Sequence, residues 1–221
     1  YMDNELPEKA LPILDLWIKE NPNDIDAQVG RGLLLAQLKK FDDAISALET
    51  AFEDSSGSAQ ANIRSQLAAV LVEKGEFDSA LKHINDALDN DPESGKFLYQ
   101  KATIFMQMKE HENAIPIFDD LLALNEWNHE VLANRAESFM ATKQYANAKE
   151  DYEKLQSLTP NDPRMYLRFA QIAEAQNSAA EELKNYELFL KYLEQDSVPA
   201  TELEQIQKRV EELRAAQGAT P

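Results

Sequence analysis

The sequence predicts an all-α protein, built as a solenoid of antiparallel helix pairs with a capping helix at its C-terminal end. The first observation is an alanine that returns with a period of about 34 residues, as in stacked helical repeats, at Ala10, Ala44, Ala80, Ala114 and Ala148. The second is composition: the 221 residues include only 6 glycines, and β-branched residues do not alternate with polar ones as they would in a sheet. We therefore expect helices throughout.

The residues around each repeated alanine predict the second helix of a pair. A bulky ring precedes the alanine by three positions and a large apolar residue follows it by four, so all three share one helix face. The rings are Phe41, Phe77, His111 and Tyr145, and the apolar residues are Leu48, Ile84, Phe118 and Tyr152. This face is expected to pack on the first helix of the pair.

A small residue twelve positions before the alanine marks the first helix. These residues are Gly32, Ala68, Ala102 and Ala136, and the same phase of the next unit has Ala170. A turn such as Gly75-Glu76 separates the two small positions, so they lie on different helices. Each marks a close approach of paired helices, where a larger side chain would overpack the contact at a cost of about 1–3 kcal/mol.

The period divides the chain into repeat units. Residues 6–22 are expected to form only the second helix of an incomplete unit, because Ala10, Leu14 and Trp17 occupy its phases. Whole units follow at 25–58, 61–94, 95–128 and 129–162. Proline with Asn or Asp closes several of them, since proline stops one helix and Asn or Asp caps the next.

The last two elements depart from this pattern. Residues 163–196 predict a degenerate unit, in which Glu182 replaces the alanine. After Pro199, residues 199–217 predict an amphipathic helix with Leu203, Ile206, Val210 and Leu213 at helical spacing. A repeat array must cover its final apolar face, so this helix is expected to be the cap.

The first helices also carry large residues at recurring phases, namely Leu67, Leu71, Leu98, Phe105, Leu132, Phe139, Tyr166 and Phe169. Together with the small residues, they resemble the tetratricopeptide repeat (TPR) family, whose motif of about 34 residues has this order. The resemblance covers nearly the whole chain and implies a single array over 1–221, wound as a right-handed superhelix. It also implies a non-catalytic scaffold or adaptor that binds a peptide or partner segment in a concave groove.

The chain departs from the family at several polar positions. Gln28 and Arg64 stand where a large apolar residue is usual, and Arg31, Lys101 and Arg135 stand where leucine is usual. We expect the charged side chains to lay their stems on apolar surface and to keep their heads in water.

The resemblance implies that the first helices line the groove. The expected lining residues are Val29, Leu33, Val72, Tyr99, Thr103, Met106, Asn134 and Met140. Leu33, Val72, Tyr99 and Met106 would bury an apolar anchor of the partner. Such a groove suits an extended or helical peptide that carries one acidic group.

Some family members clamp the C-terminal carboxylate of chaperones with Lys, Asn and Arg side chains from three units. Asn134, Arg164 and Arg168 match part of that clamp, with Arg in place of Lys, whereas Tyr99 and Thr103 occupy the positions of its first pair. The resemblance thus implies carboxylate binding without a complete chaperone clamp. Arg164 and Arg168 lie four apart on one helix face and can chelate a carboxylate. In the alternative, they pair with Glu130, Glu137 or Glu174.

The formal net charge of −18 argues against two classes of partner. Nucleic acids and anionic membrane surfaces are recognised largely through Lys and Arg, and an acidic surface repels both. The charge would steer a basic partner toward the protein, or it simply keeps an exposed array soluble.

The sequence contains no recognisable catalytic, metal or cofactor motif. The chain has no cysteine, and His83, His111 and His129 have no second ligand at metal-binding spacing. Glycine loops that cradle phosphates and nucleophile motifs are also missing. We therefore expect no enzymatic activity, no metal and no cofactor.

Several alternatives remain open. The chain is either a scaffold in its own right, an accessory part of a larger enzyme or of a secretion or envelope assembly, or an array that self-associates through Leu11, Leu14 and Trp17. Trp127 is either a staple of its turn, which we favour, or an exposed contact residue. No stretch reaches the roughly 18 apolar residues of a membrane span. We expect a soluble protein, in the cytoplasm, or in the periplasm or envelope if an upstream signal has been removed from a chain that begins at Tyr1 within a repeat.

Overall fold

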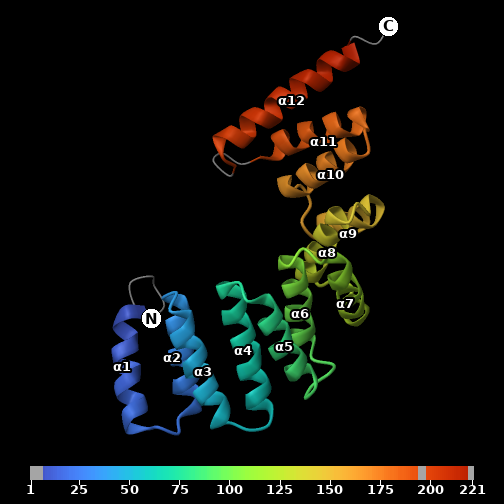
Figure 1. The fold of residues 1–221 in the computed structure, drawn as a ribbon. Coiled ribbons are helices and arrows are strands. Elements are labelled where there is room, and N and C mark those ends of the chain that lie inside the picture. The colour runs from blue at the N-terminus through green and yellow to red at the C-terminus, as the bar shows by residue number, and fades with distance from the viewer. Residues whose placement is uncertain (1–6, 194–197, 219–221) are drawn as a thin grey trace. The chain divides into compact units, whose positions relative to one another are not determined.

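The structure is a computed structural model that describes residues 7–193 and 198–218. These described residues form twelve α-helices and no strand, which confirms the all-α class (Figure 1). The helices are α1 (Pro7–Glu20), α2 (Ile25–Gln37), α3 (Phe41–Glu53), α4 (Ser58–Lys74), α5 (Phe77–Leu88), α6 (Gly95–Gln107), α7 (His111–Leu124), α8 (His129–Ala141), α9 (Tyr145–Leu158), α10 (Pro163–Ala175), α11 (Ala179–Tyr192) and α12 (Ala200–Gly218).

The chain divides into two compact parts, an N-terminal part over residues 1–117 and a C-terminal part over residues 118–221. In the N-terminal part, each helix from α1 to α6 packs on the helices next to it in sequence. In the C-terminal part, α8 to α12 do the same. Contact between sequence neighbours is the packing of a solenoid, and the pairs α2 with α3, α4 with α5, α8 with α9 and α10 with α11 are the most extensive.

The repeated alanines lie where paired helices touch. Ala44, Ala80, Ala114 and Ala148 are completely buried, as are the small residues Ala68, Ala102, Ala136 and Ala170 of the first helices. At Gly32 a Cβ atom would lie 2.7 Å from Cγ of Leu48, closer than carbon atoms can approach. The close approach that the sequence predicts is thus present in the structure.

The turn within each pair has one residue in the left-handed conformation, always five positions before the alanine phase. The residues are Lys39, Gly75, Lys109, Lys143 and Asn177, with φ between 57° and 89°. The amide of this residue bonds back to the end of the first helix, for example from Gly75 to the carbonyl of Val72 at 3.0 Å. Only Gly75 adopts this conformation without steric cost.

The expected capping helix is α12. Ile206, Val210 and Leu213 are buried in one cluster with Leu183 and Phe189 of α11. Arg209 binds the carboxylate of Glu182 through two hydrogen bonds, of 2.7 and 3.0 Å. Glu182 therefore replaces the usual alanine because its buried carboxylate receives a side chain of the cap.

In the described residues, no helix combines the length and the apolar character that crossing a bilayer requires.

Candidate peptide-binding site

Three helices of the C-terminal part, α8, α9 and α10, with the turn between α9 and α10, line an open cavity of about 520 Å³. Its lining residues are His129, Ala133, Glu137, Tyr152, Leu155, Leu158, Thr159, Asp162, Arg164, Met165 and Arg168. The volume lies in the range of about 300–1,000 Å³ that is typical of ligand sites, and such sites combine apolar walls with a few polar groups. Both arginines singled out in the sequence belong to this wall.

The apolar wall comes mainly from α9. Leu155 and Tyr152 are buried, and Leu158, the last residue of α9, is 47 % exposed. The Tyr152 ring meets Phe169 of α10 edge to face, with 6.4 Å between the ring centroids. Aromatic packing of this kind fixes the ring, so this wall of the cavity is preformed.

Arg164 stands at the exposed side of the site. Its Nη2 donates to Asp162 at 2.7 Å, its Nε donates to both oxygens of the same carboxylate at 3.1 Å, and its side chain is still 81 % exposed. Asp162 also accepts from the Arg164 amide and so caps the start of α10. These hydrogen bonds, the side-chain bonds most of all, hold the pKa of Asp162 below its usual range.

Arg168 stands deeper, in a chain of three polar groups. Its Nη2 pairs with Glu137, and its Nη1 donates to Gln171 at 3.1 Å. The Tyr152 hydroxyl donates to the same Glu137 oxygen at 3.1 Å. Burial, followed by the negative charge of Glu137, raises the pKa of the Tyr152 hydroxyl, so this group stays protonated and keeps donating at physiological pH.

The structure thus brings Arg164 and Arg168 into one cavity wall but gives each its own carboxylate. For Arg168 the partner is Glu137, the alternative raised from the sequence, and for Arg164 it is Asp162. Asn134, the third residue of the predicted carboxylate site, is not among the residues that line the cavity. A ligand carboxylate would reach Arg164 first, because Arg164 is the more exposed of the two arginines.

The predicted groove residues of the N-terminal part lie on α2, α4 and α6. Leu33 is 39 % exposed, whereas Val29, Val72, Tyr99, Thr103 and Met106 are half-buried. Val29 and Val72 pack against core clusters. Met140, on α8 of the C-terminal part, is also half-buried.

Polar bonds link the first helices α4 and α6 within this predicted groove. The Ser65 hydroxyl donates to the Gln100 side chain at 2.6 Å, and the Gln100 amide returns a bond to the Ser65 carbonyl at 3.2 Å. Lys96 donates to Asn62 at 3.2 Å. This stretch is therefore more polar than the four apolar anchor residues alone suggested.

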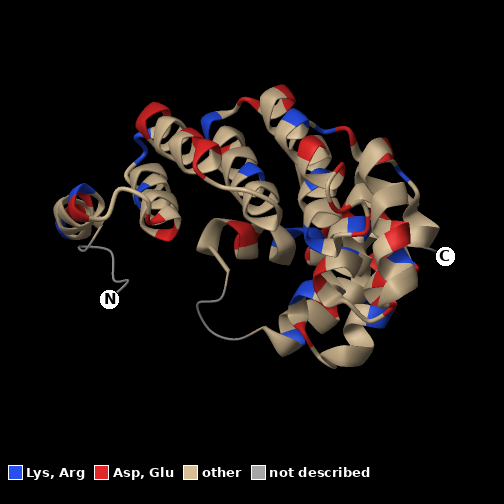
Figure 2. Cartoon of the chain, turned by 90° about the horizontal axis from the view of Figure 1, so that it is seen from below, with Lys and Arg blue, Asp and Glu red and all other residues tan. Residues whose placement is uncertain are grey.

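The charges of the helix pairs are segregated, although blue and red segments alternate in Figure 2. The first helices, α2, α4, α6, α8 and α10, carry eight Lys and Arg against five Asp and Glu. The second helices, α1, α3, α5, α7, α9 and α11, carry seven Lys and Arg against eighteen Asp and Glu. The acidic residues of the chain thus lie largely on the second helices. Several Lys and Arg side chains of the first helices form ion pairs with these carboxylates.

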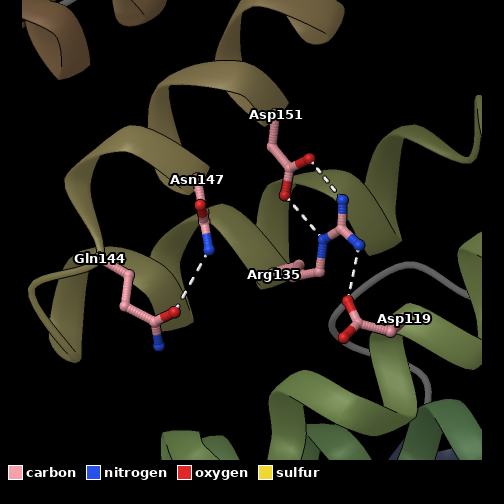
Figure 3. Close-up of polar contacts among 5 residues, drawn as sticks. All are labelled: Asp119, Arg135, Gln144, Asn147 and Asp151. Carbon is pink, nitrogen blue, oxygen red and sulfur yellow. Dashed lines mark hydrogen bonds and ion pairs between the residues drawn. The ribbon is translucent and has the colours of Figure 1, made fainter.

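Arg135 shows this pairing in detail (Figure 3). Its Nε and Nη2 donate to the two oxygens of Asp151 on α9, at 2.8 and 2.6 Å, and Nη1 donates to Asp119 on α7 at 2.7 Å. Asp151 is almost completely buried. The expectation that Arg135 keeps its head in water is therefore wrong, since two carboxylates replace the water. We assign this cluster a structural role.

The structure also shows residues that the sequence reasoning missed. Leu158 and Met165 line the cavity, and neither was proposed as a ligand contact. The sequence held a signal for Leu158, because it lies ten positions after the repeated alanine, where the first two whole units have the polar residues Asp54 and Asn90. Trp127 is 50 % exposed, which favours a contact role over the staple. In the described residues, no three His, Cys, Asp or Glu side chains are grouped to hold a metal.

Sequence models of the tetratricopeptide repeat match residues 1–59, 35–104, 95–126 and 129–162. The chain belongs to the TPR family. TPR proteins bind other proteins or peptides, and their fold supports a role as a protein-protein interaction scaffold. Among curated protein sequences, no match to this TPR chain was found.

Solved TPR structures share the fold at low sequence identity. YrrB, described as a TPR protein with an unusual peptide-binding site, has a TM-score of 0.65 and 17 % identity, over 83 % of this chain and 93 % of its own. The C-terminal part of a TPR repeat-containing protein from Cytophaga hutchinsonii has a TM-score of 0.72 and 19 % identity, over 86 % of this chain and 75 % of its own. MamA has a TM-score of 0.67 and 19 % identity, over 79 % of this chain and 98 % of its own.

Proposed function

We propose that this TPR protein is a non-catalytic scaffold that binds an acidic peptide segment of a partner, with Arg164 and Arg168 as the carboxylate-binding residues. The observation that carries the proposal is the exposure of Arg164, 81 %, at the wall of a preformed cavity. Arg binds carboxylates through paired hydrogen bonds, and a partner carboxylate can share or replace Asp162 on this guanidinium. Membership of a peptide-binding family supports the same conclusion.

The test is a selection from a displayed library of random peptides. We expect the protein to enrich peptides that combine Asp or Glu with a large apolar residue. The double variant Arg164→Glu with Arg168→Glu should lose that enrichment, because it reverses the charge of the site. The control variant Lys19→Glu with Lys208→Glu makes the same change in net charge on exposed residues of α1 and α12 and should keep it. If the double variant enriched the same acidic peptides as strongly as the control variant and the wild type, the carboxylate role would be refuted.

Self-association is a second candidate function, favoured by the surface of α1. Ile13, Leu16 and Trp17 are 70 %, 64 % and 51 % exposed, while Leu11 packs on the core beside α2. Glu8 lies in the first turn of α1 and Lys19 in the last, so two antiparallel copies of α1 would place opposite charges side by side. Sedimentation velocity at several concentrations tests this. A dimer that Leu16→Asp dissociates is expected, and a monomer at every concentration would exclude it.

A further inference from the structure

Three large apolar side chains of the C-terminal part are exposed where second helices end. Leu124 is the last residue of α7, Leu158 is the last residue of α9, and Trp127 lies in the turn before α8. Their exposed fractions are 78 %, 47 % and 50 %. We call these three residues the apolar edge. Leu124 and Leu158 share one phase of the repeat, so the edge recurs in consecutive units.

Two residues connect the apolar edge to the cavity described above. Leu158 is itself a lining residue, and Trp127 precedes the lining residue His129 by two positions. The Trp127 indole N–H donates to Glu126 at 3.2 Å, so its polar group is satisfied locally and its ring stays half exposed. A single exposed leucine needs no explanation, but an exposed apolar side chain at a cavity wall, with others at the ends of neighbouring helices, is typical of a binding surface.

The charge beside the cavity identifies the kind of side chain that would enter it. Arg164 offers an exposed cation on one wall, and Leu155, Leu158 and Met165 provide apolar surface on the others. A ligand that satisfies both needs a large apolar group within a few bonds of a carboxylate. Hydrophobic burial supplies the affinity, and the guanidinium supplies the orientation.

We propose that the cavity and the apolar edge form one docking surface for a large apolar residue of a partner peptide that carries a carboxylate next to it. The apolar side chain enters between Leu155, Leu158 and Met165, and the neighbouring part of the peptide covers Trp127. This inference rests on the proposed function for its carboxylate, and it adds the apolar contacts, which do not depend on the arginines.

The probe is N-acetyl-L-phenylalanine, which combines an aromatic ring with a carboxylate. Binding is followed by NMR through the Leu158 methyl groups and the indole N–H of Trp127, in a Trp17→Phe background that leaves Trp127 as the sole tryptophan. We expect saturable shifts at both residues, with a dissociation constant on the order of 1 mM, as for other ligands of this size. The shifts should be lost, monitored at Trp127, in Leu158→Asp.

Two controls separate this inference from the proposed function. Leu16→Asp makes the same substitution at an exposed leucine on α1, outside the predicted peptide groove, and should leave the shifts unchanged, while circular dichroism melts verify that each variant folds. Shifts that are absent, or that persist in Leu158→Asp, would overturn the docking surface. N-acetyl-L-phenylalanine amide should bind several-fold more weakly than the acid. Equal binding of the two would overturn the carboxylate role and leave the apolar contacts standing.

Discussion

Gly30 and Gly32 lie two positions apart on α2 and meet different surroundings. A Cβ atom at Gly32 would lie 2.7 Å from Cγ of Leu48 and 3.2 Å from the backbone oxygen of Ala44. At Gly30 the nearest atom is Cδ2 of Leu14, at 3.7 Å, an ordinary contact. Other units have alanine at the phase of Gly32, so the repeat pattern alone does not reveal this difference.

We expect Gly32→Ala to lower the free energy of unfolding by about 1–3 kcal/mol, because the added methyl group overpacks the contact with Leu48. Gly30→Ala should raise it by roughly 0.5–1 kcal/mol, since alanine favours the helix and meets no clash. Urea unfolding followed by circular dichroism measures both. A Gly32→Ala variant as stable as the wild type would show that Leu48 moves aside without cost.

His83 occupies the phase held by Ala47 and Ile117 in other units, and its Nδ1 is buried without a hydrogen-bond partner. Burial lowers the pKa of the imidazole below its ordinary value, although the charge of Asp86 acts in the opposite direction. At pH values between the lowered pKa and that of the unfolded chain, the unfolded chain binds more protons. The free energy of unfolding therefore falls as the pH drops below about 6.5.

The variant His83→Ile should lose this part of the pH dependence, because isoleucine has no titrating group. Melting temperatures at about pH 7.5 and about pH 5.5 measure it, with the wild type losing more stability on acidification than the variant. The same loss in both proteins would show that other groups cause it.

At the scale of the elements, first-helix arginines join neighbouring repeat units. Arg31 binds Asp15 at 2.6 Å and Arg135 binds Asp119 at 2.7 Å, in each case from a first helix to the second helix before it. Arg135 also forms an ion pair with the buried Asp151, whereas the ion pair of Arg31 with Asp15 is partly exposed. In the unit that follows Arg31, Leu67 occupies the arginine phase and contributes to the core instead.

We expect Arg135→Leu to lower the free energy of unfolding by about 3–5 kcal/mol, because it leaves Asp151 buried without its partner. The double variant Arg135→Leu with Asp151→Ala should lower the free energy of unfolding much less. Other units bury an apolar residue at each of these two phases, namely Leu67 at that of Arg135 and Ala47 at that of Asp151. Arg31→Leu, which breaks an exposed pair, should cost about 0–1 kcal/mol. A double-mutant cycle by urea unfolding measures the interaction between Arg135 and Asp151. If the effects of the two single substitutions simply added up, the two residues would not stabilise each other as expected.

At the scale of the whole molecule, helices within each of the two parts contact their neighbours in sequence, so a local defect should stay local. Arg209 and Arg214 of α12 allow a matched comparison. Arg209 binds the buried Glu182, and Arg214 binds Glu187, which is 43 % exposed. The two arginines thus connect the same helices with carboxylates of different burial.

We expect Arg209→Ala to accelerate hydrogen exchange in α10, α11 and α12, because Glu182 loses its partner, and to leave α2 to α5 unchanged. Arg214→Ala should have little effect anywhere. Mass spectrometry of exchange in both variants is the measurement. Faster exchange along the entire chain after Arg209→Ala would show that the array unfolds as one cooperative unit.

Much of the fold was predictable because its causes repeat along the sequence. Ala44 and Ala80 recur at one phase because paired helices must touch there, and the apolar stripe of α12 indicated a cap. The sequence allows the pairing of Arg168 with Glu137 as one alternative, but only the positions of the neighbouring helices show that this pair forms. The cavity was not predictable, since its walls come from three helices whose spacing no single helix specifies.

The all-α class, the helix pairs and the family can be read from local segments, because period, small residues and apolar stripes are properties of such segments. Which charges are buried, and where a ligand has room, follows from how the helices pack. Arg135, Arg164 and Arg168 look alike as residues on first helices, yet one joins repeat units and the other two line a cavity. The physical reason is that burial and pairing depend on neighbouring helices, which lie many residues away in the chain.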